Sequence, residues 1–239
     1  MAAAGGADSG MTYQLWVAIG ILVAFAVRRL QPDDRPELAG QRPALTLAAV
    51  IGAVLGAFLL ELPADLLGWT SGPDGVATIG VIGGRTVLGG LLGGWLAVEL
   101  LKRRLGIRGA TGDALAAPLA VALACGRMGC ATAGCCAGSI CPDGWWATSG
   151  TQPRWPVQWI EVIFHGSAAI LLVVAAWRGW WAGRRLAGYL ATYAILRFLL
   201  EFLRTNPPVI FGLTWYQLLA GLLFVIAATS WWRRTRQSP

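Results

Sequence analysis

The sequence predicts an all-α, polytopic membrane protein. Of its 239 residues, 56% are hydrophobic and only 13% are charged, and the mean hydropathy is +0.60. A soluble globular domain carries about 25% charged residues, roughly twice this fraction. Several apolar runs approach the length that an α-helix needs to cross a bilayer, and the alternation typical of a membrane β-barrel is absent.

Seven segments have the length and composition of membrane-spanning helices, at residues 12–29, 44–61, 76–101, 113–127, 157–177, 186–203 and 213–231. The third is interrupted by the glycine-rich stretch 83–94, and the fourth ends in "GRMGCATAGCCAG" at 126–138. We expect one integral membrane domain, 1–239, with a disordered N-terminus (1–11), an outer cysteine-rich loop (128–156) and a basic cytoplasmic tail (232–239). Because residues 1–11 lack lysine and arginine, the first span is expected to be retained and not cleaved as a signal peptide.

The distribution of basic residues predicts the orientation. Fourteen of the 19 lysines and arginines lie in four segments, 28–42, 102–108, 178–185 and 233–236. Cytoplasmic loops carry the excess of basic residues, so the N-terminus is predicted outside and the C-terminus in the cytoplasm. The net charge of +7 is then explained by an anionic membrane surface, and no nucleic-acid partner is expected.

The other five arginines are not needed for orientation. They are predicted in the outer halves of spans or in outer loops, and they are Arg85, Arg127, Arg154, Arg197 and Arg204. A charged side chain at membrane depth costs about 2.5–3.5 kcal/mol on insertion scales, which makes it a functional candidate. Arg154 and Arg204 could instead reach water by extending their side chains.

One predicted helix carries a charged face. Arg197, Glu201 and Arg204 have the spacing i, i+4 and i+7, which places them on one side of a helix. A buried Arg–Glu pair can be purely structural, but this face keeps an excess positive charge. Arginine binds phosphate oxygens bidentately, so the sequence indicates a cationic pocket for a phospholipid head group near the outer leaflet.

All five cysteines lie within 17 residues, at Cys125, Cys130, Cys135, Cys136 and Cys141. Four interpretations remain open: a loop closed by disulfides, packing of small soft side chains, a reactive thiol activated by Arg127, or a metal site. The spacing lacks the C-x2-C pair of zinc and iron–sulfur sites, which makes the metal site the least favoured of the four. The site as predicted contains no metal and no cofactor. The only histidine, His165, is expected to be a packed or hydrogen-bonded residue of the fifth span.

Other acidic residues are interpreted as structural. Glu99 is expected to pair with Lys102 or Arg103, and Asp113 to lie at a helix N-terminus. Glu161, with Gln158 at the start of the fifth span, is expected to orient Arg154 or to be solvated.

Five motifs in order make the chain resemble the prolipoprotein diacylglyceryl transferase family, over about residues 45–225. They are "GRTVLGGLLGG" (84–94), "GDALAAPLAVALACGRMG" (112–129), "RWPVQWIE" (154–161), "GYLATYAILRFLLEFLR" (188–204) and "LTWYQLL" (213–219). The family transfers a diacylglyceryl group from phosphatidylglycerol to the thiol of a lipobox cysteine and releases glycerol phosphate. The resemblance therefore implies a multi-pass transferase of the bacterial cytoplasmic (inner) membrane, with its site towards the outer leaflet.

The resemblance also implies roles for individual residues. Arg127, Arg197 and Glu201 match the family's catalytic positions, where arginines would stabilise the charge of the departing phosphate. The expected substrate-binding residues are Arg85, Gly89, Gly90, Gly126, Gly129, Arg154, Gln158 and Arg204. The expected reactive or disulfide-forming residues are Cys130, Cys135, Cys136 and Cys141. The expected partners are phosphatidylglycerol, a lipoprotein precursor and the membrane.

The chain departs from the family where the family carries polar groups. Leu88 replaces the family histidine, Cys130 replaces an asparagine, Trp155 replaces another histidine, and Ala133-Gly134-Cys135 replaces an Asn-Gly-Glu sequence. These departures leave alternatives open: a different acceptor, a thiol or redox role, or a lipid-binding paralogue without catalysis.

Overall fold

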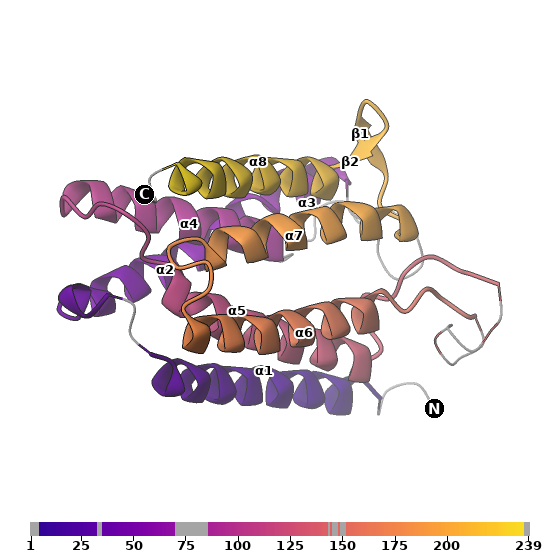
Figure 1. The fold of residues 1–239 in the computed structure, drawn as a ribbon. Helices are drawn as coiled ribbons and strands as arrows, with labels where there is room; N and C mark the ends of the chain where they lie inside the picture. The colour runs from indigo at the N-terminus through magenta and orange to yellow at the C-terminus, as the bar shows by residue number, and fades with distance from the viewer. Residues whose placement is uncertain are drawn as a thin grey trace. The chain divides into compact units, whose positions relative to one another are not determined.

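The structure is a computed structural model that describes residues 5–32, 35–69, 86–142, 144, 148 and 152–236. Helices dominate the described part (Figure 1). The α-helices are α1 (Gly5–Leu30), α2 (Arg42–Leu59), α3 (Leu62–Leu67), α4 (Val87–Arg104), α5 (Asp113–Thr132), α6 (Val157–Arg178), α7 (Arg185–Leu200) and α8 (Trp215–Thr235). Two short 3₁₀ turns, η1 (Pro36–Leu38) and η2 (Glu201–Leu203), and two strands, β1 (Pro208–Ile210) and β2 (Leu213–Thr214), complete the described elements.

The predicted all-α membrane class is confirmed. Among the described residues, six helical segments are long and apolar enough to cross a membrane: 10–30, 42–67, 113–132, 157–178, 185–203 and 215–235. The seventh long helix, α4, contains 18 residues, and four ionisable side chains in its last six positions make it less apolar. Residues 70–85, the first part of the predicted third span, lie outside the described residues. The predicted orientation of the termini stays a prediction.

Several element boundaries differ from the sequence prediction. Helix α1 begins at Gly5, inside the segment predicted to be disordered, and α8 extends to Thr235, inside the predicted tail. The expected interruption by glycines is wrong from Val87 onwards, because α4 continues without a break through the glycine pairs 89–90 and 93–94. Helix α5 continues to Thr132, five residues into the predicted outer loop. Apolar neighbours hold these glycines and small residues in helices even where their own propensity is low.

The chain folds as two compact units, each built from separate parts of the sequence. Unit 1 consists of residues 1–34 and 112–189, and unit 2 of residues 35–111 and 190–239. In unit 1, α5 packs between α1 and α6. Close approach of α1 to α5 depends on small residues, because a Cβ at Gly20 would lie 2.9 Å from the Cβ of Cys125. The start of α7 also belongs to this unit.

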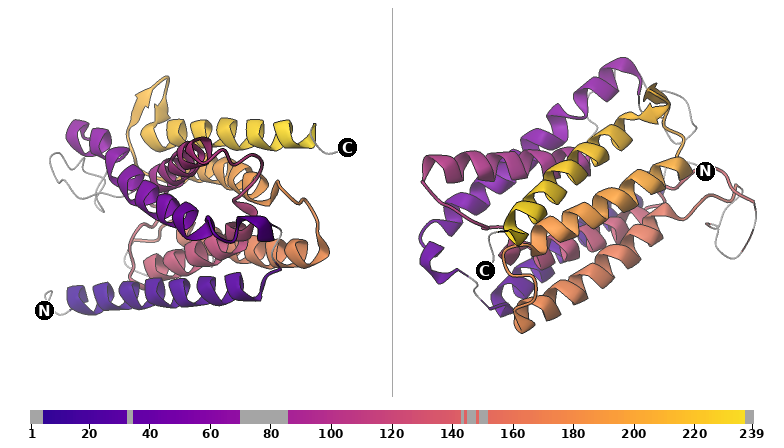
Figure 2. Two further views of the ribbon diagram at one scale, coloured as in Figure 1. Left: turned by 90° about the vertical axis from the view of Figure 1, so that its left-hand side faces the viewer. Right: turned by 45° about the horizontal axis from the view of Figure 1, so that its top comes forward.

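In unit 2, α2 and α4 pack closely against each other, and they cross at an angle in the right-hand view of Figure 2. Gly52 and Gly56 of α2 face Gly89 and Gly93 of α4, so each helix contributes a G-x-x-x-G pair. A Cβ at Gly52 would lie 2.5 Å from the carbonyl oxygen of Gly93, and one at Gly89 would lie 2.5 Å from that of Gly56. These distances leave no room for any side chain, and such backbone contact is typical of helix association in bilayers.

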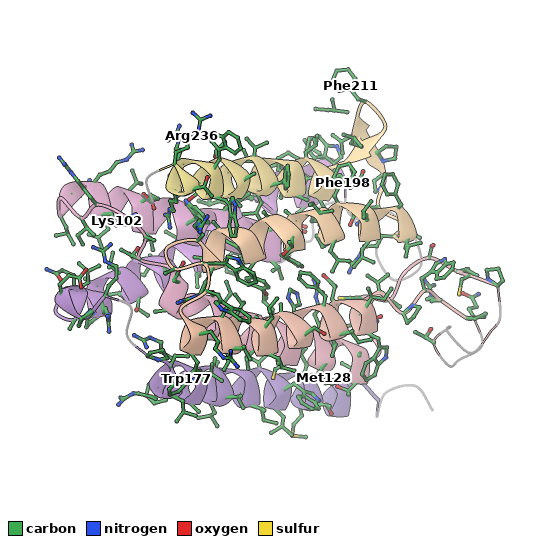
Figure 3. The ribbon with its side chains drawn as sticks, in the orientation of Figure 1. Lys102, Met128, Trp177, Phe198, Phe211 and Arg236 are labelled. Atoms are coloured by element: carbon green, nitrogen blue, oxygen red, sulfur yellow. The ribbon has the colours of Figure 1, made fainter. Side chains whose placement is uncertain are left out.

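A small antiparallel hairpin precedes α8 in unit 2. Pro208 pairs with Thr214 and Ile210 with Leu213, and the two turn residues, Phe211 and Gly212, have φ values of 52° and 75°. Positive φ at both positions is the signature of a type I′ hairpin turn. Phe211 is 97% exposed and points away from the helices at the hairpin tip (Figure 3).

We predict that Gly56→Ala lowers the stability of the protein. The added methyl group would clash with the backbone of α4, and overpacking of this kind costs about 1–3 kcal/mol. Gly221→Ala in α8 is the matched control, since nothing lies within 4 Å of the position that its methyl group would take and alanine favours a helix over glycine by about 0.5–1 kcal/mol. Thermal unfolding in detergent should show a lower Tm for the first variant only. Equal Tm values for the two variants would contradict backbone contact between α2 and α4 at Gly56.

Candidate active site

One candidate group of residues is a buried ion pair in unit 2. Arg197, in the last turn of α7, lies with its Nη1 2.5 Å from Oε2 of Glu201. The side chains are only 7% and 0% exposed, respectively. Removing one partner of such a pair leaves an uncompensated buried charge, so each side chain fixes the other.

Glu201 has partners on both carboxylate oxygens. Asn206 Nδ2 donates to Oε1 at 2.6 Å, and Thr214 Oγ1 donates to the same oxygen at 3.2 Å. Thr214 also caps α8, where it forms a capping box with Gln217. The Arg204 Nε lies 4.0 Å from Oε2. Glu201 is therefore held by three segments of unit 2: the end of α7, the following loop and the start of α8.

The geometry around Glu201 differs from the predicted single helical face. Helix α7 ends at Leu200, and Glu201 opens the 3₁₀ turn η2. Arg204 follows that turn in an extended conformation, with φ −111° and ψ 165°. The tighter turn brings Arg204 near Glu201 at spacing i+3, so the three charges meet although they do not lie along one α-helix.

Two residues near Arg197, Tyr216 and Glu61, were not predicted from the sequence to belong to the site. Tyr216 lies with its ring centre 5.8 Å from the Arg197 guanidinium carbon, a cation–π geometry. The Tyr216 hydroxyl donates to Oε1 of Glu61, a carboxylate that is 5% exposed at the end of α2. Glu61 is an acid within the apolar sequence "FLLELP", and this position at membrane depth is the signal that could have identified it.

A second candidate group is an ion pair in unit 1. Arg127 of α5 lies with its Nε 2.9 Å from Oε2 of Glu161 on α6, and Glu161 is fully buried. The expectation that Glu161 is solvated is therefore wrong, and its expected orientation of Arg154 stays a prediction. The closely packed α5 and α6 exclude water around Glu161, and the carboxylate finds its counter-charge on the neighbouring helix.

One turn further along α6, His165 is fully buried and its Nδ1 lies 2.7 Å from the hydroxyl of Tyr189. The ring of Phe164 packs edge-on against the imidazole, with 5.2 Å between ring centres. This arrangement confirms the prediction of a packed, hydrogen-bonded histidine. The predicted structural roles of Glu99, which pairs with Lys102 at 2.7 Å, and of Asp113, the first residue of α5, are confirmed too.

The cysteine cluster lies where α5 ends. Gly134 has a φ of 70°, its N–H donates to the carbonyl of Ala131, and the N–H of Cys135 donates to the carbonyl of Cys130. These are the two bonds of a Schellman motif. The Sγ atoms of Cys130, Cys135 and Cys136 lie within 4.8 Å of one another. All five cysteines belong to the described residues, and no disulfide joins any of them.

Hydrogen bonding with the thiols of Cys130 and Cys136, together with partial desolvation, holds the pKa of the Cys135 thiol well above its usual range. Cys135 is therefore protonated at neutral pH. A protonated thiol is a poor nucleophile, and this opposes the interpretation of Cys135 as an activated reactive group.

The loop after α5 is tied to the start of α6. Gln158 is 3% exposed and donates from Nε2 to the carbonyl of Cys135 at 2.7 Å. Arg154 forms an isolated antiparallel bridge with Ile140 and donates to the carbonyl of Gly138 at 3.4 Å. Cys141 is buried next to this bridge and donates its N–H to the carbonyl of Pro153. These contacts give Arg154 and Gln158 a role in holding the loop.

The four glycines expected to bind substrate have different surroundings. Gly89 and Gly90 face α2, and Gly129 faces Tyr13 and Trp16 of α1, so all three permit helix packing. A Cβ at Gly126 would meet nothing within 4 Å. Leu88, in the place of the family histidine, is buried, and Arg85 lies outside the described residues. Because Arg127 and Arg197 belong to different units, their convergence stays a prediction.

We predict that Glu161→Gln lowers the free energy of unfolding by about 3–5 kcal/mol, because it leaves Arg127 without its buried counter-charge. Glu37→Gln is the matched control. It removes a pair of similar length, 2.7 Å, with Arg35, but the two side chains of that pair, Arg35 and Glu37, are 34% and 58% exposed, and such surface pairs contribute about 0–1 kcal/mol. Denaturant unfolding in micelles measures both. A loss for Glu161→Gln no larger than for the control would contradict a buried ion pair.

Comparison with known proteins identifies the family. A family model described as prolipoprotein diacylglyceryl transferase matches residues 9–233. The chain is 27% identical over 208 residues to phosphatidylglycerol–prolipoprotein diacylglyceryl transferase 2 of Clostridium perfringens, which covers 82% of this chain and 79% of the relative. It is also 27% identical over 204 residues to phosphatidylglycerol–prolipoprotein diacylglyceryl transferase of Clostridium tetani, with 82% and 81% covered. The match extends over nearly the whole chain, and the protein therefore belongs to the prolipoprotein diacylglyceryl transferase family.

Proposed function

We propose that this protein transfers a diacylglyceryl group from phosphatidylglycerol, or a similar anionic phospholipid, to a thiol acceptor, most simply the lipobox cysteine of a prolipoprotein. Family membership over residues 9–233 supports the reaction class, and the names of both relatives include this donor and acceptor. The observation that carries the proposal is the buried Arg197–Glu201 pair, because it holds a permanent positive charge inside an apolar helix bundle.

The reaction exchanges one bond for another. The acceptor sulfur bonds to the terminal carbon of the diacylglyceryl group, while the bond from that carbon to the phosphate oxygen breaks. The phosphate oxygen keeps the electron pair and leaves as glycerol phosphate, and the thiol proton passes to a base. Negative charge on phosphate grows as the bond breaks, so donors fixed near the phosphate lower the barrier.

Arg197 and Arg127 supply these donors in the proposal. A guanidinium stays charged at every physiological pH and offers its N–H groups in a planar fork that matches phosphate oxygens. A glutamate holds each arginine in place: Glu201 pairs with Arg197 in unit 2, and Glu161 pairs with Arg127 in unit 1. Pre-organised donors need no reorganisation during bond breaking, which is why their placement contributes to rate. Arg85, Arg154 and Arg204 are proposed to add positive charge around the lipid.

Glu201 acts as a positioning residue in this scheme. Asn206, Thr214 and Arg197 engage both of its oxygens, which keeps the carboxylate turned towards Arg197. The ring of Tyr216, whose hydroxyl donates to Glu61, also lies near the Arg197 guanidinium. Leu88 brings no proton acceptor to α4, so we assign the thiol proton to an oxygen of the departing phosphate.

We propose that the protein lies in the bacterial cytoplasmic membrane with the site towards the outer leaflet. The basic segments support this orientation. Within unit 1, α5 and α6 run in opposite directions (Figure 1), so the cysteine-containing loop between them is at the opposite end from the basic residues 178–185 after α6.

A second candidate function is transfer of the diacylglyceryl group to a thiol of this chain, because three thiols begin one turn beyond Arg127. The lipidated residue would then be Cys130 or Cys135. Mass spectrometry of the intact protein, incubated with phosphatidylglycerol, would then show an added diacylglyceryl mass on one of these residues, whereas the first candidate predicts unmodified cysteines.

We predict that the wild-type gene restores growth and lipoprotein labelling to a bacterial strain depleted of its own diacylglyceryl transferase. Arg127→Lys and Arg197→Lys should each reduce labelling about 100-fold or more, since lysine keeps the charge but loses the fork. Arg236→Lys, on an exposed C-terminal arginine, is the control and should restore labelling fully. Well-expressed wild-type protein that gives no labelled lipoprotein would refute this acceptor.

We also predict that Glu201→Gln lowers turnover more than it weakens lipid binding. The amide keeps the shape of the side chain but cannot neutralise Arg197, so the guanidinium loses its fixed orientation. Because pre-organised donors act mainly on the transition state, transfer of labelled lipid in micelles should show a kcat reduced about 10-fold or more with KM changed less than about 3-fold. Glu201→Asp should recover part of the rate. Equal loss in both parameters would point to a general structural role.

A further inference from the structure

The end of α5 brings three thiols to one point. The Sγ atoms of Cys130, Cys135 and Cys136 all lie within 4.8 Å of one another. The Schellman motif explains the first contact, because it places the residue after the glycine, Cys135, over the helical residue five positions earlier, Cys130. A hydrophobic contact usually occupies these two positions, and here both carry sulfur.

The third thiol requires a backbone conformation that only a few residue types adopt readily. Cys136 has a φ of 62°, in the left-handed region, which costs a residue with a side chain about 1–2 kcal/mol. Conformations of this kind persist where the surroundings impose them, and they concentrate at functional sites. The bond from Gln158 to the carbonyl of Cys135 anchors the same turn to α6. The thiols are thus held together by the backbone.

The number of thiols distinguishes between the possible uses of the cluster. A disulfide joins two sulfur atoms and leaves the third without a function, and the bond between the adjacent Cys135 and Cys136 would be strained. Three convergent sulfurs fit a soft metal ion, since thiolates select Cu(I) and Zn(II). Zinc sites in proteins are almost always four-coordinate. Among the described histidine, cysteine and acidic residues, no fourth one joins this group, and this favours Cu(I), a d¹⁰ ion that accepts three ligands.

We propose that Cys130, Cys135 and Cys136 bind one Cu(I) ion in a three-coordinate thiolate site. Binding forms three copper–sulfur bonds and releases three protons to water, with no change in oxidation state. Coordination deprotonates a thiol outright, so bonds to the metal replace the thiol–thiol hydrogen bonds of the metal-free cluster.

The test uses the full-length protein in micelles, reduced without oxygen and titrated with Cu(I) against a coloured Cu(I) chelator. We expect one Cu(I) per chain, and X-ray absorption should show three sulfur neighbours. Because each thiolate supplies one of the three bonds, Cys130→Ser, Cys135→Ser and Cys136→Ser should each weaken binding about 10-fold or more. Cys125→Ser and Cys141→Ser are the matched controls, because these cysteines are outside the group, and they should leave the affinity unchanged.

Three results would overturn the proposal. The first is no binding by reduced wild-type protein that elutes as a single species and unfolds cooperatively. The second is an equal loss of affinity in the control variants. The third is tighter binding of Zn(II) than of Cu(I) at the same three cysteines, which would indicate a fourth ligand. The assay contains no lipid or acceptor, so its outcome is independent of the proposed transferase activity.

Discussion

The structure depends on the neutralisation of arginine side chains inside an apolar helix bundle. A guanidinium cannot lose its proton to escape burial, so every buried arginine needs a carboxylate or a set of acceptors. Glu161 meets this requirement for Arg127 and Glu201 meets it for Arg197. The helices that carry these residues must therefore end and pack where the charges meet. The change from α7 to the 3₁₀ turn η2 at Glu201 follows from that constraint, because it brings both flanking arginines to one carboxylate.

Glycine packing and charge placement work together in unit 2. The G-x-x-x-G contacts bring α2 and α4 into backbone contact, and α2 ends beside the start of α8, where Trp215 Nε1 donates to the carbonyl of Leu60 at 2.7 Å. Glu61 and Tyr216, the residues that follow Leu60 and Trp215, form a hydrogen bond with each other. This bond places the tyrosine ring near Arg197. Close helix packing at one end of the unit thus fixes the surroundings of the guanidinium at a site far away in sequence.

The sequence was sufficient for features that depend on composition and local spacing. Apolar length predicted the six segments that are long and apolar enough to cross a membrane, and ionisable residues at membrane depth selected Arg127, Arg197 and Glu201 as candidates. Partners distant in sequence were not predictable in this way: Arg127 pairs with Glu161 on another helix, and 155 positions separate Glu61 from Tyr216. Local patterns contain no information about which helices pack together. The end of α5 was placed five residues early because glycine and cysteine suggest a loop, whereas packing against α1 and α6 continues the helix to the Schellman turn.

The last turns of α5 carry two kinds of chemistry on a shared backbone. Arg127 points to Glu161, and Cys130 begins the three-thiol group only three residues later. A metal bound by Cys130, Cys135 and Cys136 would clamp the C-terminal turn of the helix and, through Gln158, the first turn of α6. Both elements also hold the Arg127–Glu161 pair. If lipid phosphate draws Arg127 away from Glu161, the energy of that movement depends on how firmly the turn is held. Thermodynamic linkage then requires that bound metal change the affinity for lipid by the same factor by which bound lipid changes the affinity for metal. The thiols, two of which replace polar residues of the family, can therefore change how Arg127 binds lipid phosphate without contacting the substrate.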